Sequence, residues 1–184
     1  MKHRLVVPLT AVLVSVAAHL MQADEKPLPT PEAILTSATT PVQHQDIPKW
    51  AADLFFAKNL NAQYDFALAL TPSCLIADFN GDGKVDVAVL VKQRSTGKLG
   101  LAIIHGATNT VTILGAGTPM GNGGDDFAWM DSWQIYSKAR AAHAKRESGM
   151  PRIRGDALLV SKTEAASALI YWNGKRYVWL QHGD

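Results

Sequence analysis

Short apolar segments separated by turns of only a few residues run from residue 64 to residue 114, and this pattern limits the possible folds more than any other feature of the sequence. Residues 85–92 have valine at every second position, and the residues between the valines are mostly apolar as well. Such a segment predicts a central strand that is buried on both faces. Connections this short join antiparallel neighbours, because a parallel pair needs a crossover of about a dozen residues or more. We therefore predict an antiparallel meander with further strands at residues 64–70, 74–77, 99–104 and 110–114.

A second group of strand-like segments closes the chain. Its last two members are separated by Asn173-Gly174, the dipeptide best suited to a two-residue type I′ turn. That turn would place Trp172 opposite Lys175, with Tyr171 and Arg176 as the next pair. The expected strands are residues 157–161, 168–172 and 175–180.

Two helices are expected before the strands: a short one at about residues 31–38 with Thr30 as its cap, and a second at residues 47–60, where Pro48 suits the first turn and Trp50 and Leu54 lie on an apolar face. Short helices followed by antiparallel strands predict a single α+β domain over residues 47–184.

The first 46 residues have a different character. A basic start is followed by an almost wholly apolar run at residues 5–18 and by small residues up to Ala23, the pattern of a secretory signal peptide over residues 1–23. The proline-rich residues 24–46 predict an extended lead-in. The sequence thus predicts a secreted or periplasmic protein with no stable membrane span after cleavage.

The charge of the chain argues against a nucleic-acid binder, and its cysteine content against a fold held by internal disulfides. Residues 1–23 hold two of the 18 basic residues and none of the 16 acidic ones, so the remaining chain is formally neutral. A globally basic nucleic-acid binder is therefore not indicated. Cys74 is the only cysteine, so no disulfide can form within the chain.

The segment with the clearest chemistry is Asp-Phe-Asn-Gly-Asp-Gly-Lys-Val-Asp at residues 78–86, here called the acidic loop. Oxygen-bearing side chains occupy its positions 1, 3, 5 and 9, a glycine at position 6 permits a sharp turn, and position 7 can offer its backbone carbonyl, as in calcium-binding loops. The predicted Ca²⁺ ligands are Asp78, Asn80, Asp82, Lys84 and Asp86. The alternative is a polar turn that binds no ion.

An EF-hand is excluded, because its position 12 needs a bidentate glutamate and here holds Val89, inside a predicted strand. Residues 78–89 instead resemble the calcium-loop segment of FG-GAP and VCBS repeats, which occur in integrin α-subunit propellers and in many exported bacterial proteins. The resemblance implies side-chain ligands at positions 1, 3, 5 and 9 of the loop and a carbonyl ligand at Lys84. The loop occurs once, so a propeller built from several copies is not expected.

A glycine-rich segment at residues 115–131 contains three further carboxylates, those of Asp125, Asp126 and Asp131. It fits neither a dinucleotide fingerprint nor a phosphate loop. We interpret it as a flexible loop, with a second cation site, or one that completes the first, as the alternative.

Aromatic residues are dense near this segment. Trp129, Trp133 and Tyr136 have helical spacing, and Trp172, Tyr177 and Trp179 follow in the last hairpin. They can fill a core or, if exposed, stack on sugar rings.

Residues 137–154 carry six basic side chains against one acid, Glu147. They form either a solvated helix face or a docking site for an anionic glycan, phosphate or lipid surface.

Together these features predict an exported calcium-binding module for binding or envelope interaction, with an unknown protein or glycan as partner and no nucleic acid. No catalytic residue is assigned, because the histidines lack metal-site spacing and the best-placed carboxylates belong to the acidic loop. The alternative is a small secreted hydrolase acting on glycans, with Asp125, Asp126 or Asp131 near the aromatic cluster.

Overall fold

A computed structural model describes residues 47–148 and 150–183. The predicted signal peptide, residues 1–23, and the predicted lead-in, residues 24–46, with its short helix, lie outside them.

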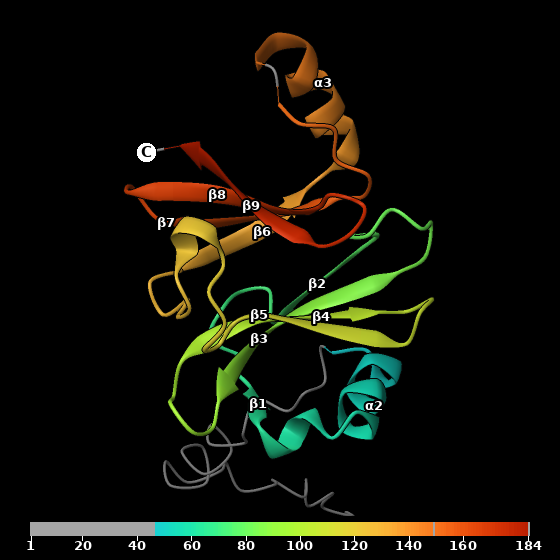
Figure 1. Ribbon diagram of the computed structural model, residues 1–184, viewed down its shortest axis with the longest axis vertical. Coiled ribbons are helices and arrows are strands. Elements are labelled where there is room, and N and C mark those ends of the chain that lie inside the picture. The colour runs from blue at the N-terminus through green and yellow to red at the C-terminus, as the bar shows by residue number, and fades with distance from the viewer. Residues whose placement is uncertain (1–46, 149, 184) are drawn as a thin grey trace, which may run out of the picture. The chain divides into compact units, whose positions relative to one another are not determined.

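Two antiparallel sheets make up most of the described chain (Figure 1). In the first sheet β3 is central: β4 and then β5 follow on one side, while β1 and β2 both pair with the other side of β3. The second sheet has the order β6-β7-β8-β9. The strands are β1 (Tyr64–Phe66), β2 (Cys74–Ala77), β3 (Asp86–Gln93), β4 (Leu99–His105), β5 (Thr110–Gly115), β6 (Ser132–Tyr136), β7 (Ala157–Lys162), β8 (Ala166–Trp172) and β9 (Tyr177–Gly183).

The predicted α+β class is wrong, because the described residues are mainly two antiparallel sheets with two α-helices, α2 (Lys49–Ala57) and α3 (Lys138–Ser148). The expected helix at residues 47–60 is present as α2, followed by the short 3₁₀ helix η2 (Leu60–Ala62). A second 3₁₀ turn, η3 (Gly121–Gly123), lies in the glycine-rich segment. The two predicted groups of strands lie in separate sheets, which are joined by residues 116–131. Strand β6 of the second sheet was not among the predicted strands.

Both sheets are buried on both faces because their strands alternate between two cores. In β7, Leu158 and Val160 belong to the core between the sheets, whereas Ala157 and Leu159 belong to the core under α3. β3 divides in the same way: its buried valines pack in the core with α2, and Ala88 and Leu90 in the core between the sheets, so the predicted burial of both faces is confirmed. The period of two therefore explains why these strands have few polar residues.

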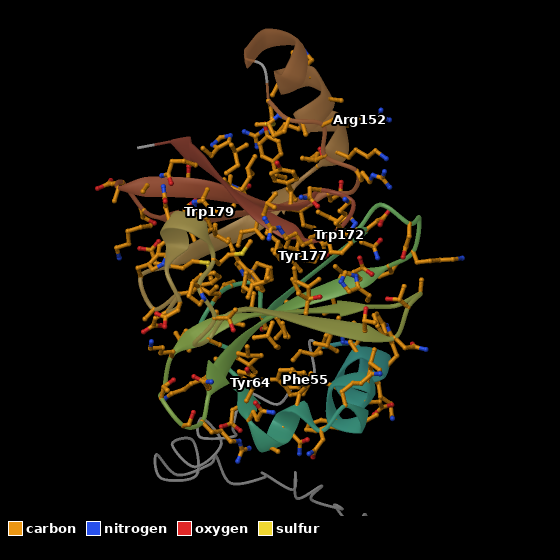
Figure 2. All side chains as sticks on the ribbon, viewed as in Figure 1. Phe55, Tyr64, Arg152, Trp172, Tyr177 and Trp179 are labelled. Atoms are coloured by element: carbon orange, nitrogen blue, oxygen red, sulfur yellow. The ribbon has the colours of Figure 1, made fainter. Side chains whose placement is uncertain are left out.

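The helices cover the outer faces of the two sheets. Ala51 and Phe55 of α2 pack with Val87 and Val89 of β3, and Figure 2 shows Phe55 beneath the first sheet. Full burial of a phenylalanine contributes about 1.5–3 kcal/mol. No helix of the described part of the chain is long and apolar enough to cross a membrane.

Two local features differ from the sequence pattern. Of the aromatic residues with helical spacing, Trp129 lies before strand β6, while Trp133 and Tyr136 lie in it, Trp133 in the core between the sheets and Tyr136 in the core under α3. A spacing of three residues places side chains on opposite faces of a strand, so both rings are buried without a helix. The strand expected at residues 64–70 ends at Phe66.

The register of the last hairpin also differs. Trp172 pairs with Tyr177, and Tyr171 with Val178, so the connection spans residues 173–176 instead of two residues. Asn173 Oδ1 accepts the amides of Lys175 at 2.9 Å and Arg176 at 3.0 Å, which closes the longer turn. The shift is two residues, so the same side chains face the core, and the apolar pattern could not distinguish the two registers.

Candidate metal centre

The acidic loop connects β2 to β3 and is anchored in the core by Phe79, which is fully buried between the two sheets. Asp78 and Asn80, on either side of Phe79, are half-buried, and Asp82 is exposed. The alternation of polar and apolar positions thus holds the loop while its polar side chains remain near the surface.

The carboxylate of Asp78 organises the turn. Its Oδ1 accepts the amides of Gly81 at 2.7 Å and Asp82 at 3.0 Å, and its Oδ2 accepts the amide of Gly83 at 2.9 Å. Three backbone donors therefore converge on one carboxylate. They leave about one acceptor position, on Oδ2, since a carboxylate has about four such positions, two on each oxygen.

Asn80 and Asp82 lie beside this carboxylate. Asn80 Oδ1 accepts the Asp82 amide at 2.9 Å, and Asn80 Nδ2 donates to Asp82 Oδ2 at 2.9 Å. Asp82 Oδ1 accepts the Lys84 amide at 2.8 Å. The structure therefore brings together the polar groups predicted at positions 1, 3 and 5.

Asp86, the first residue of β3, is completely buried at the inner end of the loop. Its Oδ2 accepts the amides of Phe79 at 3.0 Å and Asn80 at 3.3 Å, and its Oδ1 accepts that of Gly106 at 3.2 Å. His105 Nδ1 lies 3.2 Å from Asp86 Oδ2. These donors compensate a charge that would otherwise be costly to bury.

Tyr177 covers the inner side of this arrangement. Its ring stacks on His105 with 5.8 Å between centroids, and Figure 2 shows it between the two sheets. Its hydroxyl is buried and has no hydrogen-bond partner among the described residues. Burial raises the pKa of Tyr177, and the negative charges of Asp86, Asp78 and Asp82 raise this pKa further.

Sequence reasoning missed both His105 and Tyr177. They lie at strand ends far from the loop in sequence, and only the packing of the second sheet on the first brings Tyr177 there. No local sequence pattern predicts such a contact.

The segment before β7 forms an outer wall of the loop. The Asp156 amide donates to the Asp78 carbonyl at 2.7 Å, and a Cβ at Gly155 would lie 2.3 Å from that carbonyl oxygen. Gly81 has a φ of 77°, and a Cβ there would lie 2.6 Å from the backbone of Arg154. Only glycine fits this close approach of two chain segments.

Among the described residues, no three side chains of the types His, Cys, Asp and Glu form a ready metal-binding group. Asp86 lies at the buried end of the loop and Asp82 at its exposed end. The donor set nevertheless fits calcium, because it consists of hard oxygen ligands, and a buried hydroxyl without a partner in the described chain lies beside it.

The loop carboxylates also lack compensation by long basic side chains. Within residues 47–148 and 150–183, none of Asp78, Asp82 and Asp86 forms an ion pair with lysine or arginine. A cation bound there would meet negative charge that no lysine or arginine of the described chain neutralises.

The three carboxylates near the aromatic residues are held differently. Asp125 pairs with Lys98, and Asp126 Oδ1 accepts the Leu99 amide at 2.9 Å. Asp131 Oδ2 lies 2.9 Å from Lys162 Nζ. Hydrogen bonding to Lys98 lowers the pKa of Asp125, and hydrogen bonds from Lys162 and Thr163 lower the pKa of Asp131 to about 2. A general acid needs the opposite shift.

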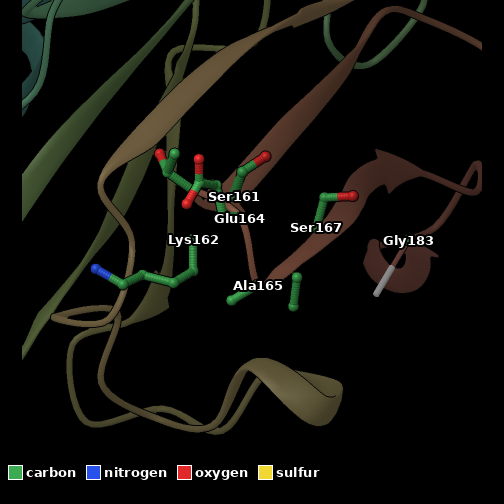
Figure 3. Close-up of a pocket in the computed structure, with 8 residues that line it drawn as sticks. Ser161, Lys162, Glu164, Ala165, Ser167 and Gly183 are labelled. Carbon is green, nitrogen blue, oxygen red and sulfur yellow. The ribbon is translucent and has the colours of Figure 1, made fainter.

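Surface pockets also lie outside the acidic loop. The one in Figure 3, about 360 Å³, surrounds the β7–β8 turn and contains Lys162, which already pairs with Asp131. Another, about 270 Å³, is lined by the half-buried indoles of Trp129 and Trp179 together with Gln181. The aromatic residues thus divide between core filling, as for Trp133, and a pocket wall.

Comparisons of the chain with protein-family models, with curated proteins and with solved structures found no match. The resemblance to FG-GAP and VCBS repeats therefore rests on the residues of the acidic loop.

Proposed function

We propose that the chain is an exported calcium-binding module in which the acidic loop holds one Ca²⁺ ion. The observation that carries the proposal is a set of three carboxylates within nine residues that lack lysine or arginine partners in the described chain and lie beside the unpartnered hydroxyl of Tyr177. Like charges within one short loop repel one another, and a divalent cation reverses that repulsion.

The proposed ligands are the side chains of Asp78, Asn80, Asp82 and Asp86 and the carbonyl of Lys84. Asp78 and Asp86 hold the loop through its backbone amides, so hydrogen bonds within the chain contribute to the order of the turn. Preorganisation of this kind lowers the cost of binding. The ion would tie the end of β2 to the start of β3.

Calcium titration of the purified mature protein tests the proposal. Loops of this chemistry in extracellular modules bind at roughly 10⁻⁴–10⁻³ M, so about 10 mM calcium should stabilise the fold by about 1.4–2.7 kcal/mol through mass action. Calorimetry should show one site, and magnesium should substitute poorly because it prefers a tighter octahedral shell.

Two variants give matched controls. Asp82→Ala should lose most of the calcium response because it removes a charged ligand, whereas Lys84→Ala should retain it because only the backbone carbonyl is used. Equal melting temperatures in calcium and in chelator, or an unchanged response in Asp82→Ala, would overturn the proposal.

Export is tested separately. We propose cleavage after the signal peptide, so the exported protein should begin near His19 or Asp24, where small residues precede the cut. Mass spectrometry that finds Met1 on the exported form would contradict this part.

The proposed partner is a protein or a glycan at the cell envelope. The half-buried indoles of Trp129 and Trp179 line a surface pocket and support the glycan, since aromatic rings stack on sugar rings. No observation favours the hydrolase alternative, because Asp125, Asp126 and Asp131 are engaged by lysines or backbone amides.

A further inference from the structure

A pocket lies between the acidic loop and α3. The polar side chains that line it offer only hydrogen-bond donors to a ligand. It has a volume of about 440 Å³, within the range of small-molecule sites. We call it the basic pocket, and its lining residues are Gly81, Lys138, Arg152, Ile153, Arg154 and Asn173.

Its three cationic side chains are available for a ligand. Lys138, Arg152 and Arg154 are exposed, and none of them forms an ion pair within the described part of the chain. Figure 2 shows Arg152 projecting outward beside α3. By contrast, Arg140 of the same basic segment lies 4.5 Å from the ring centroid of Tyr136 and is used in packing.

Asn173 adds a neutral donor. Its Oδ1 already accepts the amides of Lys175 and Arg176, which identifies the other side-chain atom as Nδ2 and leaves that nitrogen to the pocket. The nearby acid Asp156 accepts the Lys138 amide at 2.7 Å through Oδ1 and is not a lining residue.

Arg154 is held by backbone packing on two sides. Its main chain lies against Gly81, where a Cβ would be 2.6 Å away, and its Nε would be 3.0 Å from a Cβ at Gly174. The neighbouring Asp156 amide is bonded to the Asp78 carbonyl. The main chain at Arg154 is thus fixed beside the acidic loop, which places the start of its side chain at the wall of the pocket.

We propose that the basic pocket binds a phosphate or sulfate group. Such a group is an anion with at least three acceptor oxygens, which complements a lining of two guanidinium groups, an ammonium group and an amide nitrogen. The inference goes beyond calcium binding and does not depend on it.

Calorimetric titration in calcium-free buffer at constant chloride tests the proposal. The probes are sodium phosphate, sodium sulfate and glucose 6-phosphate, with sodium nitrate as a monovalent control. We expect saturable binding of the dianions and none of nitrate. Tighter binding of glucose 6-phosphate than of phosphate would identify an ester group as the ligand, and equal binding a free ion.

Arg152→Gln and Lys138→Gln should each weaken binding about tenfold, since a hydrogen bond to a charged group contributes about 1.5 kcal/mol or more. The matched control is Lys58→Gln at the end of α2, which should bind as the wild type does. Both Arg152 and Lys58 are exposed, so their variants should melt normally. The proposal is overturned if the wild type binds none of the dianions, or if Lys58→Gln weakens binding as much as Arg152→Gln.

Discussion

The acidic loop and the glycine-rich segment share a local design. In each, an aspartate precedes a fully buried phenylalanine, Asp78 before Phe79 and Asp126 before Phe127, and both rings belong to the core between the sheets. The two segments differ in what holds their carboxylates. Asp78 accepts amides of its own loop, whereas Asp126 accepts the amide of Leu99, and Asp125 pairs with Lys98.

This difference shows which carboxylates are structural supports. Asp125 and Asp131 fasten a loop to lysines distant in sequence, and each charge is compensated. Asp78 and Asp82 shape their own turn and have no lysine or arginine partner among the described residues. Composition alone does not distinguish the two clusters, but the partners of the carboxylates do.

The largest expected effect concerns the buried phenylalanine that the two segments have in common. Phe79→Ala and Phe127→Ala should each reduce the free energy of unfolding by about 3–5 kcal/mol, because each leaves a cavity in the same core. Urea unfolding without calcium measures both. Only Phe79→Ala should also weaken calcium binding. An equal loss of calcium affinity in Phe127→Ala would contradict the difference between the two segments.

The second prediction concerns two glycines of the acidic loop with similar backbone angles. Gly81→Ala should cost about 2–4 kcal/mol, because positive φ strain adds to overlap with Arg154. Gly83 has a φ of 81°, but a Cβ at this position would meet no atom within 4 Å, so Gly83→Ala should cost only about 1 kcal/mol. Urea unfolding measures both costs. Similar losses in the two variants would show that Arg154 does not pack against the loop.

The third prediction contrasts the two kinds of carboxylate without calcium. Asp126→Ala leaves the half-buried Leu99 amide without its acceptor and should cost about 1–2 kcal/mol. Asp82→Ala should change the free energy of unfolding by less than about 0.5 kcal/mol, because its hydrogen bonds are exposed and charge repulsion is relieved. Addition of calcium should then raise the melting temperature of Asp126→Ala but not that of Asp82→Ala.

The smallest effect depends on pH. The pKa of Asp131 is lowered to about 2 in the folded chain by hydrogen bonds from Lys162 and Thr163. A lowered pKa stabilises the fold above the unfolded value of about 4, and this contribution is lost as the pH falls toward 2. Wild type should therefore be more stable than Asp131→Asn at about pH 5, and the difference should shrink by about pH 2.5. Urea unfolding at the two pH values measures it, and a constant difference would contradict the Lys162 contact.

Local patterns predicted much of the first sheet. The valine alternation of β3 and the short turns after it are consequences of side-chain period and chain length, so the β3-β4-β5 meander is confirmed. The position of α2 followed from its apolar face. The fold class was wrong because it was predicted from short helices before the strands, whereas the described residues are mainly two antiparallel sheets with two α-helices.

The residues of the candidate sites also include some that the sequence predicted to lie together and others that it did not. The oxygen ligands of the acidic loop lie within nine residues, so the sequence by itself determined which side chains come together at Asp78, Asn80 and Asp82. His105 and Tyr177 reach the loop through strand pairing and the packing of two sheets, and Arg154 reaches Gly81 through a close backbone contact. Those neighbours were decided by the tertiary structure alone, because burial of both sheet faces, and not any local spacing, places them there.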